Sequence, residues 1–253
     1  MRGGVAKGFQ RRGRGGGRLA TTTGDVVLAP SPVIRADKLS RTFGEGQRGV
    51  SALKGLTCDT AAGSQWAVTG PSGSGKSTLL YLLGALDRPT AGRLTVGGRD
   101  WSALSPADRA LYRYTTVGLV FQEFQLIESL AVWDNVRLPF VGRRRERRMH
   151  EERARWLLEA VGMGDHLPRP AGVLSGGEKQ RGALARALVN DPLLLCDEPT
   201  GNLDQATGVL VMDLIQQLAA ASPAKTLVVI THDPGVAGRF AHQLHLRDGE
   251  LVA

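Results

Sequence analysis

Short apolar runs alternate along this chain with longer segments whose apolar residues recur at helical spacing. Apolar runs bounded by turn-forming residues are typical of buried strands, and apolar residues three and four positions apart are typical of helices that cover a sheet. The pattern predicts strands at 33–43, 53–60, 64–70, 92–98, 117–122, 193–199 and 226–232, and a terminal hairpin at 243–253. It predicts helices at 76–85, 105–114, 131–162 (interrupted near Pro139 and Gly142), 174–190 (entered from a loop) and 204–221.

This alternation predicts an α/β domain with a mainly parallel sheet and helices on both of its faces, because a strand can follow a parallel neighbour only after a crossover. The helical block at about 123–173 breaks the alternation, so we expect it to be an inserted helical subdomain. A chain of 253 residues with 42% apolar residues is large enough for one such domain with its insertion.

The net charge of +8 is concentrated at the beginning of the chain. Residues 1–18 contain six Arg or Lys and no acid, which leaves 8 − 6 = +2 for the rest. We expect residues 1–30 to be a disordered, basic, Gly- and Arg-rich arm, because they have little to bury. The arm could contact nucleic acid or anionic lipid, and the alternatives are a solvated tail or a segment that precedes the start codon in use.

Two further features of the composition concern compartment and membrane. No window approaches about 18 uninterrupted apolar residues, so we expect no membrane-crossing helix. Cys58 and Cys196 lie far apart in the sequence. We interpret both as free thiols in a reducing compartment.

Residues 70–78, GPSGSGKST, match the phosphate-loop pattern GxxxxGK[ST] and lie between a predicted strand and a predicted helix. Glycines let the backbone curl so that its N–H groups point at phosphate oxygens, and the following helix adds its dipole. Lys76 should reach the β- and γ-phosphates, and Ser77 should bind Mg²⁺. The nucleotide-binding residues predicted from this loop are Gly70, Ser72, Gly73, Ser74, Gly75, Lys76, Ser77 and Thr78.

Two adjacent carboxylates, Asp197 and Glu198, follow an apolar run. Neighbouring carboxylates at the end of a buried strand repel each other and lose hydration, so their position requires a partner. Asp197 is expected to hold Mg²⁺, directly or through water. Glu198 is placed to accept a proton from an attacking water. A helix-capping role would explain one of the two carboxylates but not both.

Three weaker signals stand at a helix start and at two strand ends. Ser175, Gly176 and Gly177 open a predicted helix with exposed N–H groups and a hydroxyl, which suits phosphate but also an ordinary flexible turn. Gln122 could bond the metal or the water, and His232 could approach the γ-phosphate, although each could also be an ordinary surface residue. Because one γ-phosphate already has a loop, a lysine and a metal, the second phosphate-binding helix start suggests a second nucleotide.

Together these motifs resemble, in order and rough spacing, those of the ABC-type ATPases: the Lys76 loop, Gln122, LSGGEKQR at 174–181, LLLCDEPTGNLD at 193–204 and THD at 231–233. LSGG separates this family from other phosphate-loop NTPases. The resemblance covers about residues 33–251. It implies a P-loop NTPase fold over residues 31–253, with a mainly parallel α/β core, an N-terminal antiparallel β subdomain and the inserted helical subdomain.

The resemblance also implies a head-to-tail homodimer. Two ATP molecules would each bind between the Lys76 loop of one subunit and the Ser175–Gly177 segment of the other, which explains the second phosphate-binding helix. Asp204 corresponds to the loop that bridges the two subunits. Phe43 matches the aromatic residue that stacks on adenine, with core packing as the alternative for that ring.

The catalytic and metal-binding roles are carried over in the same way. Glu198 corresponds to the general base, and His232 to the switch histidine. Gln122 corresponds to the residue that couples the site to a membrane partner. With Ser77 and Asp197, Gln122 completes the predicted Mg²⁺ ligands.

Within the family, GALDRPTAGRL, VFQEFQLIESLAVWDNVRLPF and DEPTGNLD resemble ATPase subunits of the lipoprotein-release, macrolide-export and cell-division group. This implies an ATP-hydrolysing subunit, dependent on Mg²⁺, that powers a separate transmembrane permease from the cytoplasmic face of the membrane. The alternative is an ATPase that regulates cell-wall hydrolysis through a membrane partner, without transport. Departures at 128–129 and 170–172, near the expected partner surface, leave the partner and substrate open.

We expect no nucleic-acid partner. ABC relatives that act on nucleic acid usually carry two cassettes, a coiled-coil insertion or zinc-binding cysteines, and this sequence has none of these features.

Overall fold

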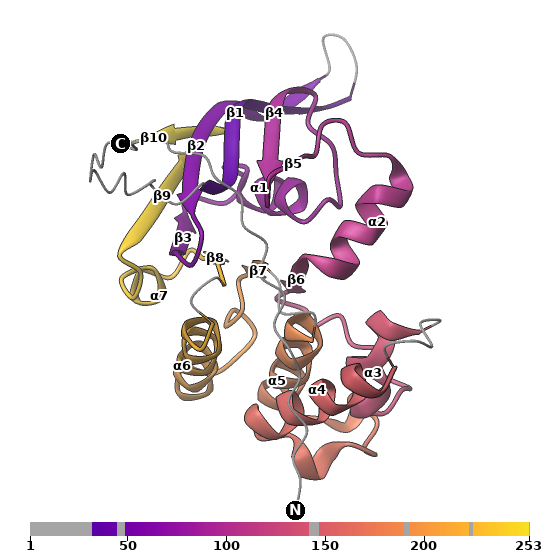
Figure 1. Ribbon diagram of the computed structural model, residues 1–253. Coiled ribbons are helices and arrows are strands. Elements are labelled where there is room, and N and C mark those ends of the chain that lie inside the picture. Colours follow the sequence, from indigo (N-terminus) through magenta and orange to yellow (C-terminus); the bar gives the residue numbers. More distant parts are fainter. Residues whose placement is uncertain (1–31, 45–48, 142–146, 190–192, 223–224, 253) are drawn as a thin grey trace, which may run out of the picture.

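Two sheets form the framework of the protein in a computed structural model (Figure 1). The larger has the strand order β10-β9-β3-β8-β7-β6, and its neighbours are parallel except for the β9–β10 pair. The smaller sheet, β2-β1-β4-β5, is antiparallel. The structure describes residues 32–44, 49–141, 147–189, 193–222 and 225–252, so the basic arm predicted at 1–30 lies outside the described residues.

The larger sheet contains β3 (Gln65–Thr69), β6 (Val117–Val120), β7 (Leu193–Asp197), β8 (Leu227–Ile230), β9 (His242–Arg247) and β10 (Glu250–Val252). The smaller sheet contains β1 (Pro32–Phe43), β2 (Val50–Ala61), β4 (Ala91–Val96) and β5 (Arg99–Asp100). The helices are α1 (Lys76–Leu83), α2 (Pro106–Thr115), α3 (Val132–Arg137), α4 (Arg147–Ala160), α5 (Gly176–Leu188), α6 (Gln205–Ala220) and α7 (Pro234–Ala237). Single 3₁₀ turns are η2 (Leu138–Phe140), η3 (Gly164–His166) and η4 (Ala171–Val173).

Strand β7 shows why its sequence is apolar without interruption. Leu193 and Leu195 pack in the core shared with α1 and the smaller sheet. Leu194 and Cys196 point to the opposite face, where they pack in the core shared with α5 and α6. A strand covered on both faces has no solvent side, so it does not alternate between apolar and polar residues. This burial places the carboxylate of Asp197 at the edge of the core.

The helical block lies between β6 and β7 and groups α3 and α4 against α5, at the end of the molecule away from the smaller sheet (Figure 1). Asn135 of α3 is fully buried, and its side chain bonds the backbone of Ile127, Leu130 and Ala131. A buried amide with all of these partners fixes the loop that leads from β6 into the helices.

The fold class predicted from the sequence is confirmed. Most differences concern element ends, and the short elements β5 and α7 were not predicted. Strand β6 ends at Val120 and β7 at Asp197, so Gln122 and Glu198 lie on the loops that follow. The terminal hairpin forms, and its first strand, β9, also pairs in parallel with β3, which adds a strand to the central sheet. In the described part of the chain, no helix combines the length and apolar character that crossing a bilayer requires.

Candidate nucleotide-binding site

Most of the predicted phosphate loop, the two carboxylates and His232 meet at the carboxyl ends of β3, β7 and β8, the edge at which open α/β sheets bind ligands. A cavity of about 550 Å³ lies there. It is lined by Ala52, Ser72, Gly73, Gly75, Lys76, Ser77, Thr78, Asp197, Glu198, Ile230 and His232. The structure therefore brings together the phosphate loop, the two carboxylates and the predicted switch histidine.

Two glycines of the loop have conformations that exclude a side chain. Gly70, at φ +143°, lies so close to β9 that a Cβ atom would be 2.0 Å from the carbonyl oxygen of Leu246. Gly75, at φ +101°, would place a Cβ atom 2.3 Å from the carbonyl oxygen of Ala52. Positive φ and close backbone approach both require glycine. These contacts hold the loop between β2 and β9 and start α1 at Lys76.

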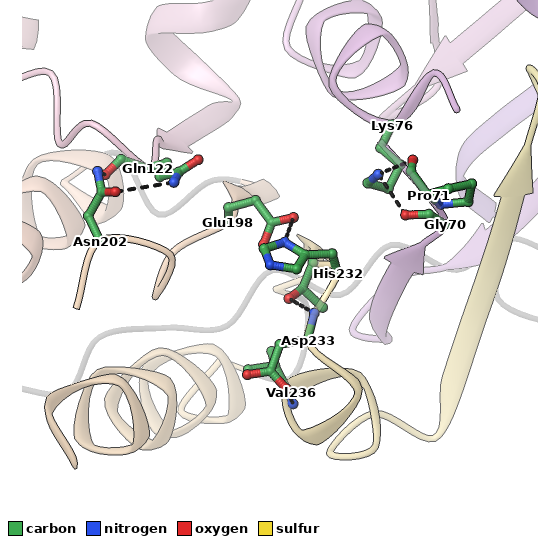
Figure 2. Close-up of polar contacts among 10 residues, drawn as sticks. Gly70, Pro71, Lys76, Gln122, Glu198, Asn202, His232, Asp233 and Val236 are labelled. Carbon is green, nitrogen blue, oxygen red and sulfur yellow. Dashed lines mark hydrogen bonds and ion pairs between the residues drawn. The ribbon is translucent and has the colours of Figure 1, made fainter. Parts of the chain in front are cut away.

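Lys76 is buried, and its ammonium group lies over its own loop. Nζ donates hydrogen bonds of 2.8 Å to the carbonyl oxygens of Gly70 and Pro71 (Figure 2). Ser74 is also buried in this loop, and its hydroxyl has no hydrogen-bond partner among the described residues. A cation next to a curled backbone is the arrangement that binds phosphate oxygens.

Asp197 and Ser77 present oxygen atoms to the same part of the cavity. Burial raises the pKa of Asp197, and the negative charge of Glu198 raises it further. A hydrogen bond from the Ser77 side chain and the positive charge of Lys76 act in the opposite direction. A cation would offset the cost of burying this carboxylate. Mg²⁺ prefers oxygen ligands such as carboxylates and hydroxyls. In phosphate-binding sites it usually takes one or two protein carboxylates together with the substrate phosphates. The two residues therefore fit Mg²⁺.

Glu198 and His232 form a pair across the mouth of the site. His232 Nδ1 lies 2.8 Å from Glu198 Oε1 (Figure 2). Glu198 has φ 45°, a left-handed conformation that is uncommon for a residue with a side chain. Its N–H donates to the carbonyl oxygen of Ile230 at 3.0 Å, and its carbonyl oxygen accepts from the N–H of Gly201 at 3.0 Å. Asp233 caps α7 and so fixes the chain directly after His232.

Gln122 is not brought to the other site residues. Its side-chain Nε2 donates to Asn202 Oδ1 at 3.2 Å, and Asn202 Nδ2 donates back to the Gln122 carbonyl oxygen at 2.9 Å (Figure 2). It does not contribute to the cavity lining. Of the three predicted metal ligands, the structure places Ser77 and Asp197 together and leaves Gln122 bonded to Asn202.

The segment Ser175–Gly177 also lies outside the cavity, at the start of α5. Ser175 caps this helix: its hydroxyl oxygen accepts from the N–H of Glu178 at 3.4 Å. The Glu178 carboxylate in turn accepts from the N–H of Ser175 at 2.7 Å and from its hydroxyl at 2.8 Å. This reciprocal pair is a capping box.

Asp204 and Phe43 likewise stand away from the cavity. Asp204 caps α6, accepting from the Thr207 N–H at 3.0 Å and from its hydroxyl at 2.6 Å. These two bonds, the hydroxyl first, lower the pKa of Asp204. Phe43 is 43% exposed at the end of β1, and the guanidinium of Arg41 lies 4.4 Å from its ring centre. That exposure does not support the alternative of core packing for Phe43.

Sequence reasoning missed three residues at or near these positions. Ala52 lines the cavity from β2, and no local signal marks it. Asn202, two residues before the predicted Asp204, forms two hydrogen bonds with Gln122. Glu178 completes the cap of α5, and the S-x-x-E spacing from Ser175 was a readable capping signal.

A strand, a curled glycine loop and a helix that begins at a buried lysine, next to a carboxylate suited to Mg²⁺, define the nucleotide site of a P-loop NTPase. The ABC transporter family matches residues 53–201, more than half of the chain, and the chain belongs to this family. Its fold and motif set are therefore those of the ATP-binding cassettes of transporters.

The relatives of this chain include ATP-binding proteins of lipoprotein-release and macrolide-export systems. The chain is 45% identical over 223 residues to the "Lipoprotein-releasing system ATP-binding protein LolD 2" of Rhodospirillum rubrum, covering 87% of this chain and 96% of that protein. It is 40% identical over 223 residues to the "Macrolide export ATP-binding/permease protein MacB" of Hyphomonas neptunium, covering 88% of this chain but 34% of that longer protein.

Solved structures support the same fold. A dimeric post-hydrolysis state of the ATP-binding cassette MJ0796, bound to ADP and Pi, matches with a TM-score of 0.78 and 35% identity, covering 87% of this chain and 97% of that one. The protein cbiO1 from Clostridium perfringens, described as part of the ABC transporter complex cbiONQ, matches with a TM-score of 0.78 and 26% identity, covering 88% of each chain.

Proposed function

We propose that this protein is the ATP-hydrolysing subunit of a transporter complex and powers a separate transmembrane permease of the lipoprotein-release or peptide- and drug-export type. The relative of Rhodospirillum rubrum, named for lipoprotein release, aligns over nearly its whole length, whereas the macrolide-export relative includes a permease part that this alignment does not cover. Both support a cassette that acts on a membrane partner supplied by another chain or domain. Its place would be peripheral, at the cytoplasmic face of the membrane.

One observation carries the proposal of a head-to-tail dimer. The cavity with Lys76, Asp197 and Glu198 contains no residue of the α5 start, although Ser175 and its neighbours are the element that distinguishes the family. A second copy of the chain would bring its Ser175–Gly177 segment to the nucleotide held here. The dimeric state of MJ0796 supports this arrangement. Asp204, two residues beyond Asn202 at the start of α6, would face the partner subunit.

The chemistry proposed is attack of water on the γ-phosphate of ATP. The water oxygen bonds to phosphorus, the bond to the bridging oxygen breaks, and ADP leaves with that oxygen's electron pair. The carboxylate of Glu198 takes the proton of the attacking water, and His232 holds that carboxylate through its Oε1 atom. Ser77 and Asp197 would hold Mg²⁺, which supplies positive charge to the phosphates when bound.

Gln122 and Phe43 complete the proposal. Gln122 would leave Asn202 to approach the metal and the water, so that the loop between β6 and α3 reports on the nucleotide. Phe43 would stack on adenine with the ring face that Arg41 does not cover.

The test of this function is Glu198→Gln, which keeps the side-chain shape and removes the base. We expect ATP binding to persist while turnover falls by about 10²–10⁴-fold, the usual loss on removing a positioned general base. Size-exclusion chromatography with ATP should then show a trapped dimer. Glu250→Gln in β10, away from the cavity, is the matched control. Full activity of Glu198→Gln would remove Glu198 from its role.

The permease is tested separately, by purifying the tagged Glu198→Gln protein from detergent-solubilised membranes with ATP present. A multi-spanning membrane protein should co-purify and should be released when ATP is omitted. Repeated recovery without any membrane protein would count against the transport function while leaving the ATPase intact.

A further inference from the structure

The start of α5 is held by a contact from outside its own helix. His166 in η3 places Nε2 2.9 Å from Oε1 of Glu178, and the guanidinium of Arg169 lies 3.7 Å from the same oxygen. The other oxygen, Oε2, accepts both hydrogen bonds from Ser175. The two carboxylate oxygens of Glu178 thus divide their partners between the η3 segment and the signature serine.

The segment that carries His166 is itself anchored to α3. The Trp133 N–H donates to the Leu167 carbonyl oxygen at 3.1 Å, and the Val132 N–H donates to the Arg169 carbonyl oxygen at 2.9 Å. His166 is mostly enclosed, with its side chain 23% exposed, and Nδ1 is buried without a hydrogen-bond partner among the described residues. An imidazole held in this way donates through Nε2, because in the described part of the chain an acceptor faces that nitrogen and not Nδ1.

The hydroxyl of Ser175 has one proton, which in this structure goes to Glu178. If Ser175 binds a phosphate of the nucleotide held by the second subunit, its hydroxyl proton must turn away from Glu178 and toward that phosphate. Glu178 then loses one of its bonds and faces a second negative charge near the helix start. The bond from His166 and the positive charge of Arg169 do not depend on Ser175, so they keep the carboxylate in place during this exchange.

We propose that His166 is a positioning residue for the signature serine: through Nε2 it holds the Glu178 carboxylate, and thereby the N–H and hydroxyl of Ser175, in place to bind the nucleotide of the opposite subunit. This inference rests on the proposed function, since it requires Ser175 to act across a dimer. His166 itself touches no nucleotide, and its effect passes through Glu178.

The experiment measures ATP-driven dimerisation of the full chain in the Glu198→Gln background, by analytical ultracentrifugation over a range of ATP concentrations. His166→Leu should raise the ATP concentration for half-maximal dimer by about three- to tenfold, the order expected for losing one ordinary, partly exposed hydrogen bond. Binding of a fluorescent ATP analogue to the monomer should stay unchanged, because the Lys76 loop is untouched. His242→Leu is the matched control, since that ring stacks on Trp66 at the opposite end of β3.

Two conservative variants separate positioning from packing. The amide nitrogen of His166→Gln reaches the position of Nε2 and should restore dimerisation to within about twofold, whereas His166→Asn reaches only the position of Nδ1 and should behave like His166→Leu. If His166→Gln is as impaired as His166→Leu, or if His166→Leu matches the parent, the inference is wrong. The Gln and Asn variants decide the question even if the leucine variant does not fold.

A double-mutant cycle shows whether the effect passes through Glu178. In a Glu178→Ala background, His166→Leu should add no further loss, and a fully additive loss would overturn the inference. Two comparisons separate the failure of the head-to-tail dimer from the failure of the role of His166. If the Glu198→Gln parent forms no dimer with ATP, the head-to-tail dimer is wrong and the role of His166 falls with it. If the parent dimerises and Ser175→Ala weakens the dimer while His166→Leu does not, only the role of His166 is wrong.

Discussion

Gly70 and Gly73 provide a controlled test of how the phosphate loop is held. Both have positive φ, +143° and +78°. A Cβ atom on Gly70 would meet the carbonyl oxygen of Leu246 at 2.0 Å and the hydroxyl of Ser74 at 2.8 Å, whereas a Cβ atom on Gly73 would meet nothing within 4 Å. Gly73→Ala therefore measures the cost of the backbone conformation, and Gly70→Ala adds the contact with β9.

The magnitudes follow from these contacts. A left-handed conformation costs a residue with a side chain about 1–2 kcal/mol. At Gly70 the Leu246 oxygen must also move by at least 3.0 − 2.0 = 1.0 Å, since Cβ contacts shorter than 3.0 Å are essentially never found. Forcing an added methyl group into a packed site costs about 1–3 kcal/mol more. For a chain of this size, about 1 kcal/mol lowers Tm by about 2–4 °C. Gly70→Ala should thus melt about 2–12 °C below Gly73→Ala.

The assay is thermal unfolding followed by circular dichroism, with each variant compared to the parent without nucleotide. ATP binding is measured beside it. Lys76 donates to the carbonyl oxygen of Gly70, so displacing this residue should also weaken nucleotide binding. If the two alanine variants melt at the same temperature, β9 does not hold the back of the loop and the reasoning is refuted.

Three further predictions concern charge and thiol chemistry. Lys76→Ala should weaken ATP binding by about tenfold or more in a fluorescence titration, because a charge-assisted contact to phosphate is lost, while the exposed Lys54→Ala should leave it unchanged. Hydrogen bonds from Ser175 lower the pKa of Glu178, so the ionised carboxylate stabilises the fold at pH values above the ordinary carboxyl pKa. That stabilisation is lost as the pH falls through the lowered pKa. Glu178→Gln should therefore have a lower melting temperature than the parent at pH 7, and the difference in melting temperature should close in acid. Burial raises the pKa of Cys58 to about 11 and raises that of Cys196 as well, so both should react slowly with a thiol reagent at pH 8 and rapidly after denaturation.

Elements with two buried faces were predictable from sequence, because burial on both sides forces an uninterrupted apolar run. Leu193–Cys196 is such a run, and the strand ends where the first carboxylate appears. The phosphate loop was predictable for a different reason: its turns require backbone conformations that favour glycine, and the glycines are visible in the sequence. Both kinds of information lie within a few consecutive residues.

Long-range pairing was not predictable in the same way. The hairpin that contains β9 was expected, but its parallel pairing with β3, and hence the contact of Leu246 with Gly70, joins opposite ends of the domain. The bond between Gln122 and Asn202 is similar, since each side chain has several possible partners and only the fold selects one. Periodicity describes which face a residue occupies and does not identify its neighbour across the sheet.

Three residues that break local preferences lie together at the cavity. Glu198 holds a left-handed conformation, Asp197 is a carboxylate whose pKa is raised by burial, and Lys76 is a buried cation. Each feature costs stability, and a chain shaped only for packing would replace these residues with apolar ones or glycine. In the proposed function, one event would offset these costs together: the binding of a metal-bound phosphate next to an attacking water. Under the proposed function, a nucleotide bound between the two carboxylates and Lys76 would explain why the carboxylates are adjacent, which packing alone leaves unexplained.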